Sequence, residues 1–388
     1  MSSAVVVVGG GYAGTLVAKS LDGDAKVTLI DPRDAFVNFS ASLRAAARPG
    51  WAHHPFFAYR TLLEHGDVLR DTVTSADATG VTLATGGRVA AGYLVLATGS
   101  RHSYPAHPRH ANTSAAQAVA DLHVTNAQLG RAGRVLILGA GPVGLELAGE
   151  IREVWPDKRI TVVDPSSELL PGFLPEVREE LRRQLEELEV ELRLGTSLTT
   201  LPPVEPATES TFTVRTDTGE PITADIWFRS FGARVNTGYL ADGALVELTE
   251  RRTVPVDDHL NVAGHRNVYA LGDIADLPDA KMATHAQTQA PVVVENIRAQ
   301  LRGEQPGAVY EPGSVPRIFL PLGTRAGVGQ LPGPEGGAIA APLETVIQRK
   351  GADLFTARFA ERFAPAAPGP ASAQLRLSST GRPPRSRG

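Results

Sequence analysis

Three glycines near the N-terminus have the spacing of a phosphate-binding turn. Gly9, Gly11 and Gly14 in GGGYAG follow four consecutive valines and match the pattern G-x-G-x-x-G. The first glycine of that pattern allows a tight turn, the second lets the backbone approach a pyrophosphate, and the third lets a helix pack close to the strand. Asp31 ends the next apolar run, residues 26–30, where a carboxylate can accept hydrogen bonds from an adenosine ribose. The segment therefore predicts a dinucleotide site.

The same pattern recurs in RVLILGAGPVGLELAGEI, with Gly139, Gly141 and Gly144. The run RITVVD follows and ends in Asp164, where a second ribose-binding acid belongs. Its negative charge would repel a 2′-phosphate, which favours NADH over NADPH. The neighbouring basic pair at 158–159 weakens that argument, because it would attract the same phosphate. Two such units predict two bound dinucleotides.

Glu146 and Glu150 follow the second glycine turn, four residues apart on one helical face. Acids in the first turns of a helix are favoured by the helix dipole, so both can simply be solvated. The interpretation that we favour for Glu146 places it against the nicotinamide end of the second dinucleotide.

A third apolar strand, NVYALGD, ends in Gly272 and Asp273. A buried carboxylate needs hydrogen-bond donors, and the ribityl hydroxyls of a flavin supply them. We therefore expect FAD at the first site. A long helix is predicted over residues 281–299, and its N-terminal N–H groups can stabilise a reduced flavin. His285, near its start, either touches substrate or packs.

Two further segments are expected to cross between the units. Residues 93–97 form a buried strand, after which Thr98 and Gly99 turn against a nucleotide or simply end the strand. Residues 225–232 resemble this crossing, and Gly232 at their end is expected to be a further cofactor-binding residue. The histidines of residues 101–112 lie among prolines that favour a mobile crossing, and we expect no metal site there.

Composition narrows the possible functions. The chain has 388 residues, of which 42% are hydrophobic and 21% charged, so two or three soluble domains are expected. A net charge of -4 gives no field that would attract nucleic acid. The chain has no cysteine, so redox chemistry must come from a bound cofactor. The N-terminus has no signal-peptide pattern, and a cytoplasmic location is expected.

The motifs VVVVGGGYAG, YLVLATGS, GAGPVGLELAGEI, HLNVAGHRNVYALGDIAD and GTRAGVGQ together carry a family resemblance. The chain resembles the glutathione-reductase-like flavoproteins with two dinucleotide-binding domains. Within them it is similar to the ferroptosis-suppressor and AMID type of apoptosis-inducing-factor relatives, NAD(P)H:quinone oxidoreductases related to type II NADH dehydrogenases. The resemblance implies NAD(P)H oxidation by FAD with a quinone as acceptor. By position it assigns FAD contacts to Gly9, Gly11, Gly14, Arg44, Val73 and Asp273, and an NADH contact to Glu146.

Arg44 also has a simpler interpretation, as part of a loop and short helix after the second strand. The flavin interpretation places its guanidinium at an anionic or carbonyl edge of the ring.

The implied fold is α/β, with two Rossmann-like domains and a small α+β C-terminal domain. We expect a discontinuous FAD domain over residues 1–112 and 249–307, an NAD(P)H domain over 113–248, a C-terminal domain over 308–364 and a disordered tail over 365–388. Apolar and basic residues between 342 and 363 suit docking on an acidic membrane surface, or packing on the flavin domain or a dimer partner. We favour packing.

The acceptor is the open part of the sequence-based hypothesis. A quinone-like molecule is the first choice. A ferredoxin- or rubredoxin-type carrier or a small metabolite is the alternative within enzymes. A redox-dependent binding protein that senses NADH is the alternative from another class.

Overall fold

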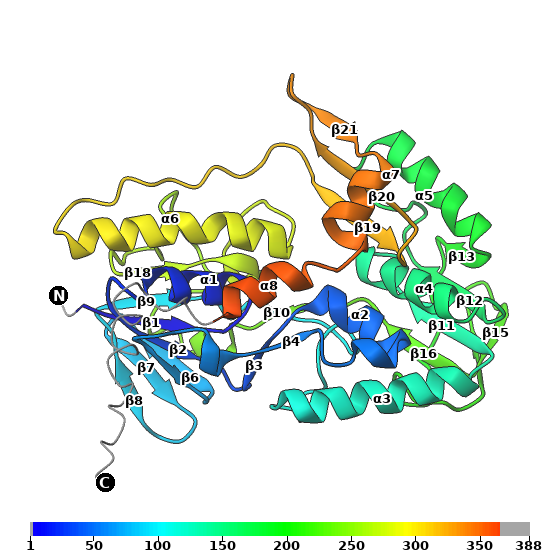
Figure 1. Cartoon of the computed structure of the whole chain (residues 1–388), viewed down its shortest axis with the longest axis horizontal. Helices are drawn as coiled ribbons and strands as arrows, with labels where there is room; N and C mark the ends of the chain where they lie inside the picture. The colour runs from blue at the N-terminus through cyan, green and yellow to red at the C-terminus, as the bar shows by residue number, and fades with distance from the viewer. Residues whose placement is uncertain (1–2, 365–388) are drawn as a thin grey trace, which may run out of the picture.

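Two parallel β-sheets form the cores of the two halves of the molecule (Figure 1). The computed structural model describes residues 3–364. The first sheet contains, in spatial order, β18 (Val268–Ala270), β9 (Tyr93–Leu96), β1 (Ala4–Val8), β2 (Lys26–Ile30) and β5 (Asp67–Leu69). The second contains β13 (Val190–Leu194), β12 (Arg159–Asp164), β11 (Arg134–Leu138) and β16 (Ile226–Arg229). The predicted α/β class with two Rossmann-like units is confirmed.

The valines of β1 are buried on both faces of the first sheet, as a central parallel strand requires. On one face Val5 and Val7 pack against α1 (Tyr12–Leu21) and α6 (Ala283–Leu301). On the other face Val6 and Val8 meet a small antiparallel sheet. That sheet consists of β6 (Val73–Asp77), β7 (Gly80–Leu83) and β8 (Arg88–Ala90). Because β18 pairs with β9, this half is built from two separate stretches of chain.

The second half repeats the same design. Val135 and Ile137 of β11 face the helices of this half, whereas Leu136 and Leu138 face a β-hairpin. The helices are α3 (Ala115–Arg131), α4 (Pro142–Val154) and α5 (Pro175–Glu187). The hairpin is β14 (Phe212–Arg215) with β15 (Pro221–Ala224).

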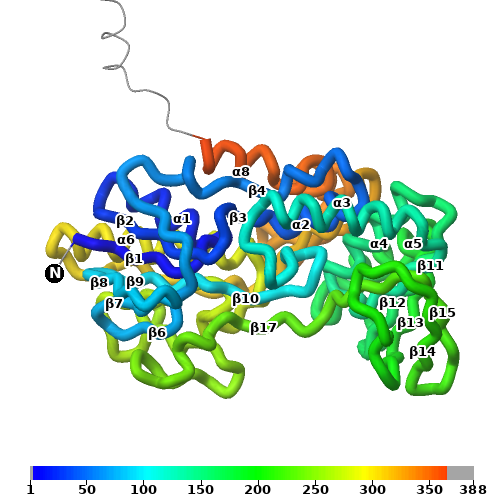
Figure 2. The backbone as a smooth tube through the Cα atoms, turned by 90° about the horizontal axis from the view of Figure 1, so that it is seen from below, coloured from blue at the N-terminus to red at the C-terminus, as the bar shows by residue number. Residues whose placement is uncertain are grey.

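The two halves are joined by two crossings that run side by side. β10 (Ser100–Arg101) pairs in antiparallel fashion with β17 (Arg234–Val235), in the middle of the molecule (Figure 2). The other elements of the first half are β3 (Ala35–Val37), α2 (Phe39–Ala47), β4 (Phe56–Ala58) and single 3-10 turns at Pro49–Trp51, Tyr59–Thr61, Gly238–Leu240 and Gly272–Ile274.

The C-terminal segment lies across both halves. It consists of β19 (Ile318–Leu322), β20 (Ala326–Pro332), β21 (Ala338–Ala340), α7 (Leu343–Val346), a π-helix (Ile347–Gly351) and α8 (Thr356–Phe363). Phe359 and Phe363 of α8 are buried against Phe36 and Phe57 of the first half. This contact favours the packing interpretation of the apolar and basic segment. The tail expected over residues 365–388 lies outside the described residues.

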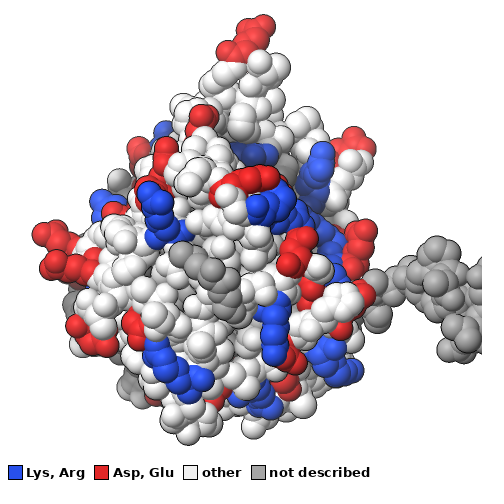
Figure 3. Space-filling view, turned by 90° about the vertical axis from the view of Figure 1, so that its left-hand side faces the viewer, with Lys and Arg blue, Asp and Glu red and all other residues white. Residues whose placement is uncertain are grey.

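The surface of the first half shows no broad region of one charge at the end seen in Figure 3, where basic and acidic side chains alternate. Among residues 3–364, no helix combines the length and hydropathy that a bilayer-spanning segment needs.

Candidate functional site

The first glycine turn is shaped by close backbone contacts at two of its three glycines. A Cβ added to Gly9, whose φ is +102°, would lie 2.5 Å from the Ala97 carbonyl oxygen. A Cβ on Gly14 would overlap the Gly9 carbonyl oxygen. A Cβ on Gly11, in contrast, would meet no atom within 4 Å. The strand and helix therefore fix the first and third glycines, whereas the second faces open space.

The second turn reproduces this arrangement. A Cβ on Gly139, whose φ is +111°, would lie 2.8 Å from the Ser230 carbonyl oxygen, and one on Gly144 would overlap the Gly139 carbonyl oxygen. A Cβ on Gly141 would again meet no atom within 4 Å. The two turns thus leave the same position open.

The open glycines are the N-cap residues of α1 and α4. Neither Gly11 nor Gly141 has a side chain that caps the helix, so the first N–H groups of both helices lack side-chain acceptors. An uncapped helix N-terminus carries a partial positive charge and suits a phosphate group. Both turns therefore fit the pyrophosphate of a dinucleotide.

In each of the two dinucleotide-binding units, an aspartate accepts hydrogen bonds from backbone N–H groups beside the glycine turn. Asp31 accepts hydrogen bonds from the backbone N–H groups of Gly10 (2.8 Å) and Arg33 (2.9 Å). Asp164 accepts from those of Ala140 (2.7 Å) and Ser166 (2.8 Å). Each carboxylate is therefore held at the carboxyl end of the second strand of its unit, beside the glycine turn.

The basic pair near Asp164 in the sequence is remote from it in the structure. Arg159 begins β12 and Asp164 ends it, so the two residues lie at opposite ends of the strand. Lys158 donates to the Ala132 carbonyl oxygen at 2.5 Å. The two basic side chains therefore do not offset the charge of Asp164.

Asp273 lies beside the first crossing. Its carboxylate accepts a hydrogen bond from the Ser100 hydroxyl, which is 3.3 Å from His102 Nε2. Burial lowers the pKa of His102, although Asp273 acts in the opposite direction. Gly272, with φ +75°, donates its N–H to Gln289 Oε1 of α6 at 2.6 Å. The structure thus brings the third acid, the first crossing and α6 together.

The first crossing is fastened to the second by backbone contacts. Thr98 Oγ1 donates to the Asn236 carbonyl at 2.7 Å, and the Gly99 carbonyl accepts from the Asn236 N–H at 2.9 Å. Gly99 and Gly232 adopt positive φ values of +61° and +76°, which favour glycine. Both predicted glycine crossings therefore need glycine for their backbone conformation.

Glu146 is buried in α4 and pairs with a residue that the sequence did not single out as a site residue. Lys350 Nζ lies 2.5 Å from Glu146 Oε1 and also donates to the Phe319 carbonyl at 3.2 Å. Burial raises the pKa of Glu146, and the Lys350 ammonium opposes this rise. Lys350 comes from the π-helix, a rare element that often marks functional sites. The alternative of solvated acids is wrong, because Glu150 is buried as well.

The Arg44 guanidinium, which is expected to contact the flavin, is bound by protein groups in the structure. Its Nε donates to Glu150 Oε1 at 2.8 Å, and the rest of the guanidinium donates to the carbonyls of Gly351 and Ala352 at 2.7 and 3.0 Å. The side chain is 1% exposed. These contacts tie α2 to α4 and to the C-terminal segment, so the guanidinium is already occupied by protein groups.

Two other expected site residues, Val73 and His285, lie among protein groups that the sequence did not predict. Val73 begins β6 and packs in the apolar layer under the first sheet. His285 Nδ1 lies 3.5 Å from Asp279 Oδ1, and the other oxygen of this carboxylate accepts a hydrogen bond from the Tyr310 hydroxyl. The imidazole of His285, at the start of α6, is thus oriented by the Asp279 carboxylate.

Comparisons with known proteins agree with this geometry. The family model described as pyridine nucleotide-disulphide oxidoreductase matches residues 3–290. Ferroptosis suppressor protein 1 of Taeniopygia guttata is 33% identical over 362 residues, covering 91% of this chain and 94% of that protein. The protein of the same name from Homo sapiens is 30% identical over 337 residues, covering 85% and 88%.

A solved structure has the same fold over nearly the whole chain. The sulfide:quinone oxidoreductase of Aquifex aeolicus superposes with a TM-score of 0.71 at 17% identity, covering 97% of this chain and 96% of that one.

Proposed function

Because the chain belongs to the pyridine nucleotide-disulphide oxidoreductase family and is an FAD-dependent NAD(P)H oxidoreductase, we propose that it oxidises NADH and reduces a quinone-like acceptor. The observation that carries the proposal is a site that occurs twice, which we call a cradle. Each cradle consists of an uncapped helix N-terminus, a glycine with open space beside it (Gly11 or Gly141) and an aspartate bound by backbone N–H groups (Asp31 or Asp164). The chain has no cysteine, so it lacks the dithiol with which members of such a family act on disulfides. This leaves an acceptor that takes electrons without a thiol intermediate.

The first cradle is the proposed FAD site. Its helix N-terminus at Gly11 binds the pyrophosphate, and Asp31 accepts hydrogen bonds from the adenosine ribose. Asp273, in the 3-10 turn that follows β18, accepts from the ribityl hydroxyls. FAD, when bound, supplies the two-electron chemistry that the side chains of this protein lack.

The second cradle is the proposed NADH site. Gly141 lets the backbone of α4 approach the pyrophosphate, and Asp164 accepts from the ribose hydroxyls. A 2′-phosphate would meet the Asp164 carboxylate, and the basic residues nearby in sequence lie elsewhere. The structure therefore supports a preference for NADH over NADPH.

The Glu146–Lys350 pair has a positioning role in this proposal. Glu146 follows the NADH cradle on α4, and a carboxylate there can accept from the carboxamide of the nicotinamide. Lys350 holds the carboxylate in place through its hydrogen bond, and its ammonium opposes the rise in the Glu146 pKa that burial causes. The C-terminal segment therefore helps to complete the NADH site.

Two half-reactions measured separately test the proposal. The purified protein, reduced anaerobically with NADH in a stopped-flow instrument, is mixed with a soluble quinone, a ferredoxin-type carrier or oxygen. We expect rapid reoxidation by the quinone and slower reoxidation by the others. Faster electron transfer to the carrier protein than to the quinone would indicate that the acceptor is a protein. A long-lived reduced state with every acceptor would indicate an NADH sensor instead.

A further inference from the structure

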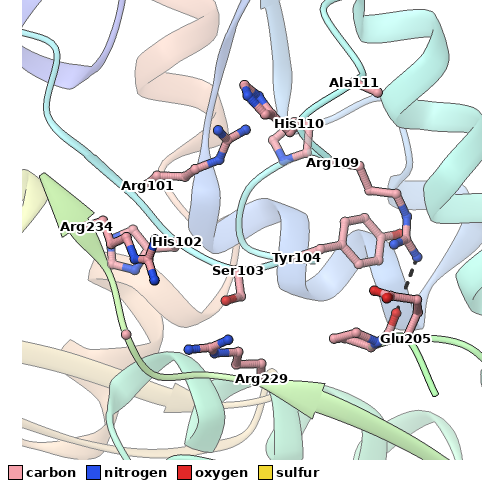
Figure 4. Close-up of a pocket in the computed structure, with 13 residues that line it drawn as sticks. Arg101, His102, Ser103, Tyr104, Arg109, His110, Ala111, Glu205, Arg229 and Arg234 are labelled. Atoms are coloured by element: carbon pink, nitrogen blue, oxygen red, sulfur yellow. Dashed lines mark hydrogen bonds between the residues drawn. The ribbon is translucent and has the colours of Figure 1, made fainter. Parts of the chain in front are cut away.

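A cleft between the two crossings is not explained by either cradle. It has a volume of about 580 Å³, within the range of small-molecule sites, and lies between residues 101–111, residues 205–206 and the end of β16. Figure 4 shows Arg101, Arg229 and Arg234 on one side of it and Arg109 with Glu205 on the other. The open glycines of the two cradles are not among its lining residues.

The two sides differ in how their charges are neutralised. Arg109 lies 3.5 Å from the Asp121 carboxylate and donates to the Pro206 carbonyl at 3.4 Å. Across residues 3–364, by contrast, no ion pair or side-chain hydrogen bond joins Arg101, Arg229 or Arg234 to a partner. Three arginine side chains therefore line this side of the cleft without a protein counter-ion.

Arg101 and Arg229 are also partly removed from water, whereas Arg234 is exposed. Arg229 stacks over the Phe231 ring at 4.5 Å, and its Nε is buried with no hydrogen-bond partner. Burial and the nearby charge of Arg33 lower the pKa of Arg101. Buried donors and gathered like charges are both unfavourable unless an acceptor of opposite charge is bound. The arrangement has the character of an anion site.

Phosphate suits the cleft better than a single carboxylate does. Each guanidinium group can donate two parallel hydrogen bonds to two oxygens of a phosphate. Three such groups suit a ligand that carries several negative charges. Arg101 comes from the first crossing, whereas Arg229 and Arg234 come from the second. An anion held by all three would connect the two segments that join the halves.

We propose that this cleft binds a small phosphate-bearing ligand other than the two dinucleotides, held by Arg101, Arg229 and Arg234. The ligand bridges the two crossings and so links the FAD half to the NADH half.

Calorimetric titration of the flavin-loaded protein with inorganic pyrophosphate tests the proposal. Arg234→Ala and Arg101→Gln each remove one donor, and we expect each to weaken pyrophosphate binding about tenfold or more, as the loss of a charge-assisted hydrogen bond does. Arg234 is exposed and its strand pairs through backbone groups, so its substitution leaves the fold intact. Arg131→Ala is the matched control, because Arg131 is an exposed arginine of α3 paired with Glu209.

The outcomes separate a built site from general charge attraction. Failure of the wild-type protein to bind millimolar pyrophosphate, or an equal loss of affinity in Arg131→Ala, would overturn the proposal. A repeat in saturating NAD⁺ should leave the pyrophosphate affinity unchanged, whereas displacement by NAD⁺ would assign the cleft to the dinucleotide groove. Binding is read without turnover, so the result stands even if the proposed quinone reduction fails.

Discussion

Replacing Gly11 with alanine separates cofactor binding from protein folding. Gly11 has φ −80° and ψ −163°, an extended conformation that any residue adopts, and its added methyl group meets no protein atom. A glycine-to-alanine change at such a position stabilises a protein by about 0.4–1 kcal/mol through the unfolded chain. The methyl group would, however, occupy the space where the pyrophosphate approaches the helix.

The expected loss in FAD affinity follows from the hydrogen bonds that the phosphate can no longer reach. Each bond to a charged group contributes about 1.5–3 kcal/mol, so losing one weakens FAD binding by about 10- to 150-fold. The assay measures urea unfolding of the FAD-free protein and the FAD dissociation constant by flavin fluorescence. We expect unfolding at the same or a higher urea concentration than in the wild type, together with weaker FAD binding.

Gly141→Ala is the matched control, because its methyl group also meets no protein atom but lies in the other cradle. We expect it to retain FAD and to raise the KM for NADH by a similar factor. A Gly11→Ala protein that binds FAD as tightly as the wild type, or a Gly141→Ala protein that loses FAD, would refute the assignment of the two cradles.

Three further changes test other parts of the structure. Asp164→Ala should raise the KM for NADH and lower that for NADPH, and steady-state kinetics with unchanged NADPH use would contradict the repulsion argument. Arg44→Met leaves the buried Glu150 carboxylate without its main partner. We expect the free energy of unfolding to fall by about 3–5 kcal/mol in urea titrations of the FAD-free protein. Unchanged stability together with a loss of FAD would instead support a contact between Arg44 and the flavin. The hydrogen bond from Arg134 lowers the pKa of Asp225 to about 2, so this contact stabilises the fold above the ordinary aspartate pKa and is lost as the pH falls from about 4 towards 2. Asp225→Asn should remove that part of the acid sensitivity seen by circular dichroism, and an identical acid transition in both proteins would count against it.

The sequence was informative where local patterns determine local structure. The valine run and the spacing of Gly9, Gly11 and Gly14 predict a strand, a turn and a helix, because each step depends on neighbouring residues. The fold class, which follows from two such units, is confirmed. Lys350 could not be found in this way, since it lies in a π-helix and meets Glu146 only through tertiary packing.

The same limit explains why the protein contacts of Arg44 could not be predicted. A basic residue near a predicted flavin site suggests an anionic ligand, whereas its actual partners are Glu150 on α4 and carbonyls of the C-terminal segment. The cluster around the cleft was also beyond local patterns, because Arg101 and Arg229 belong to crossings that are far apart in sequence. Contacts of this kind depend on how the two halves are placed, which no local spacing encodes.

The most direct test of the whole account is an anaerobic titration of the purified protein with NADH, followed by flavin absorbance. We predict a yellow protein with one flavin per chain, which loses its colour as one equivalent of NADH is added. A colourless protein that cannot be reconstituted with FAD, or a bound flavin that NADH does not reduce, would contradict the claim that the two cradles hold an electron donor and its acceptor.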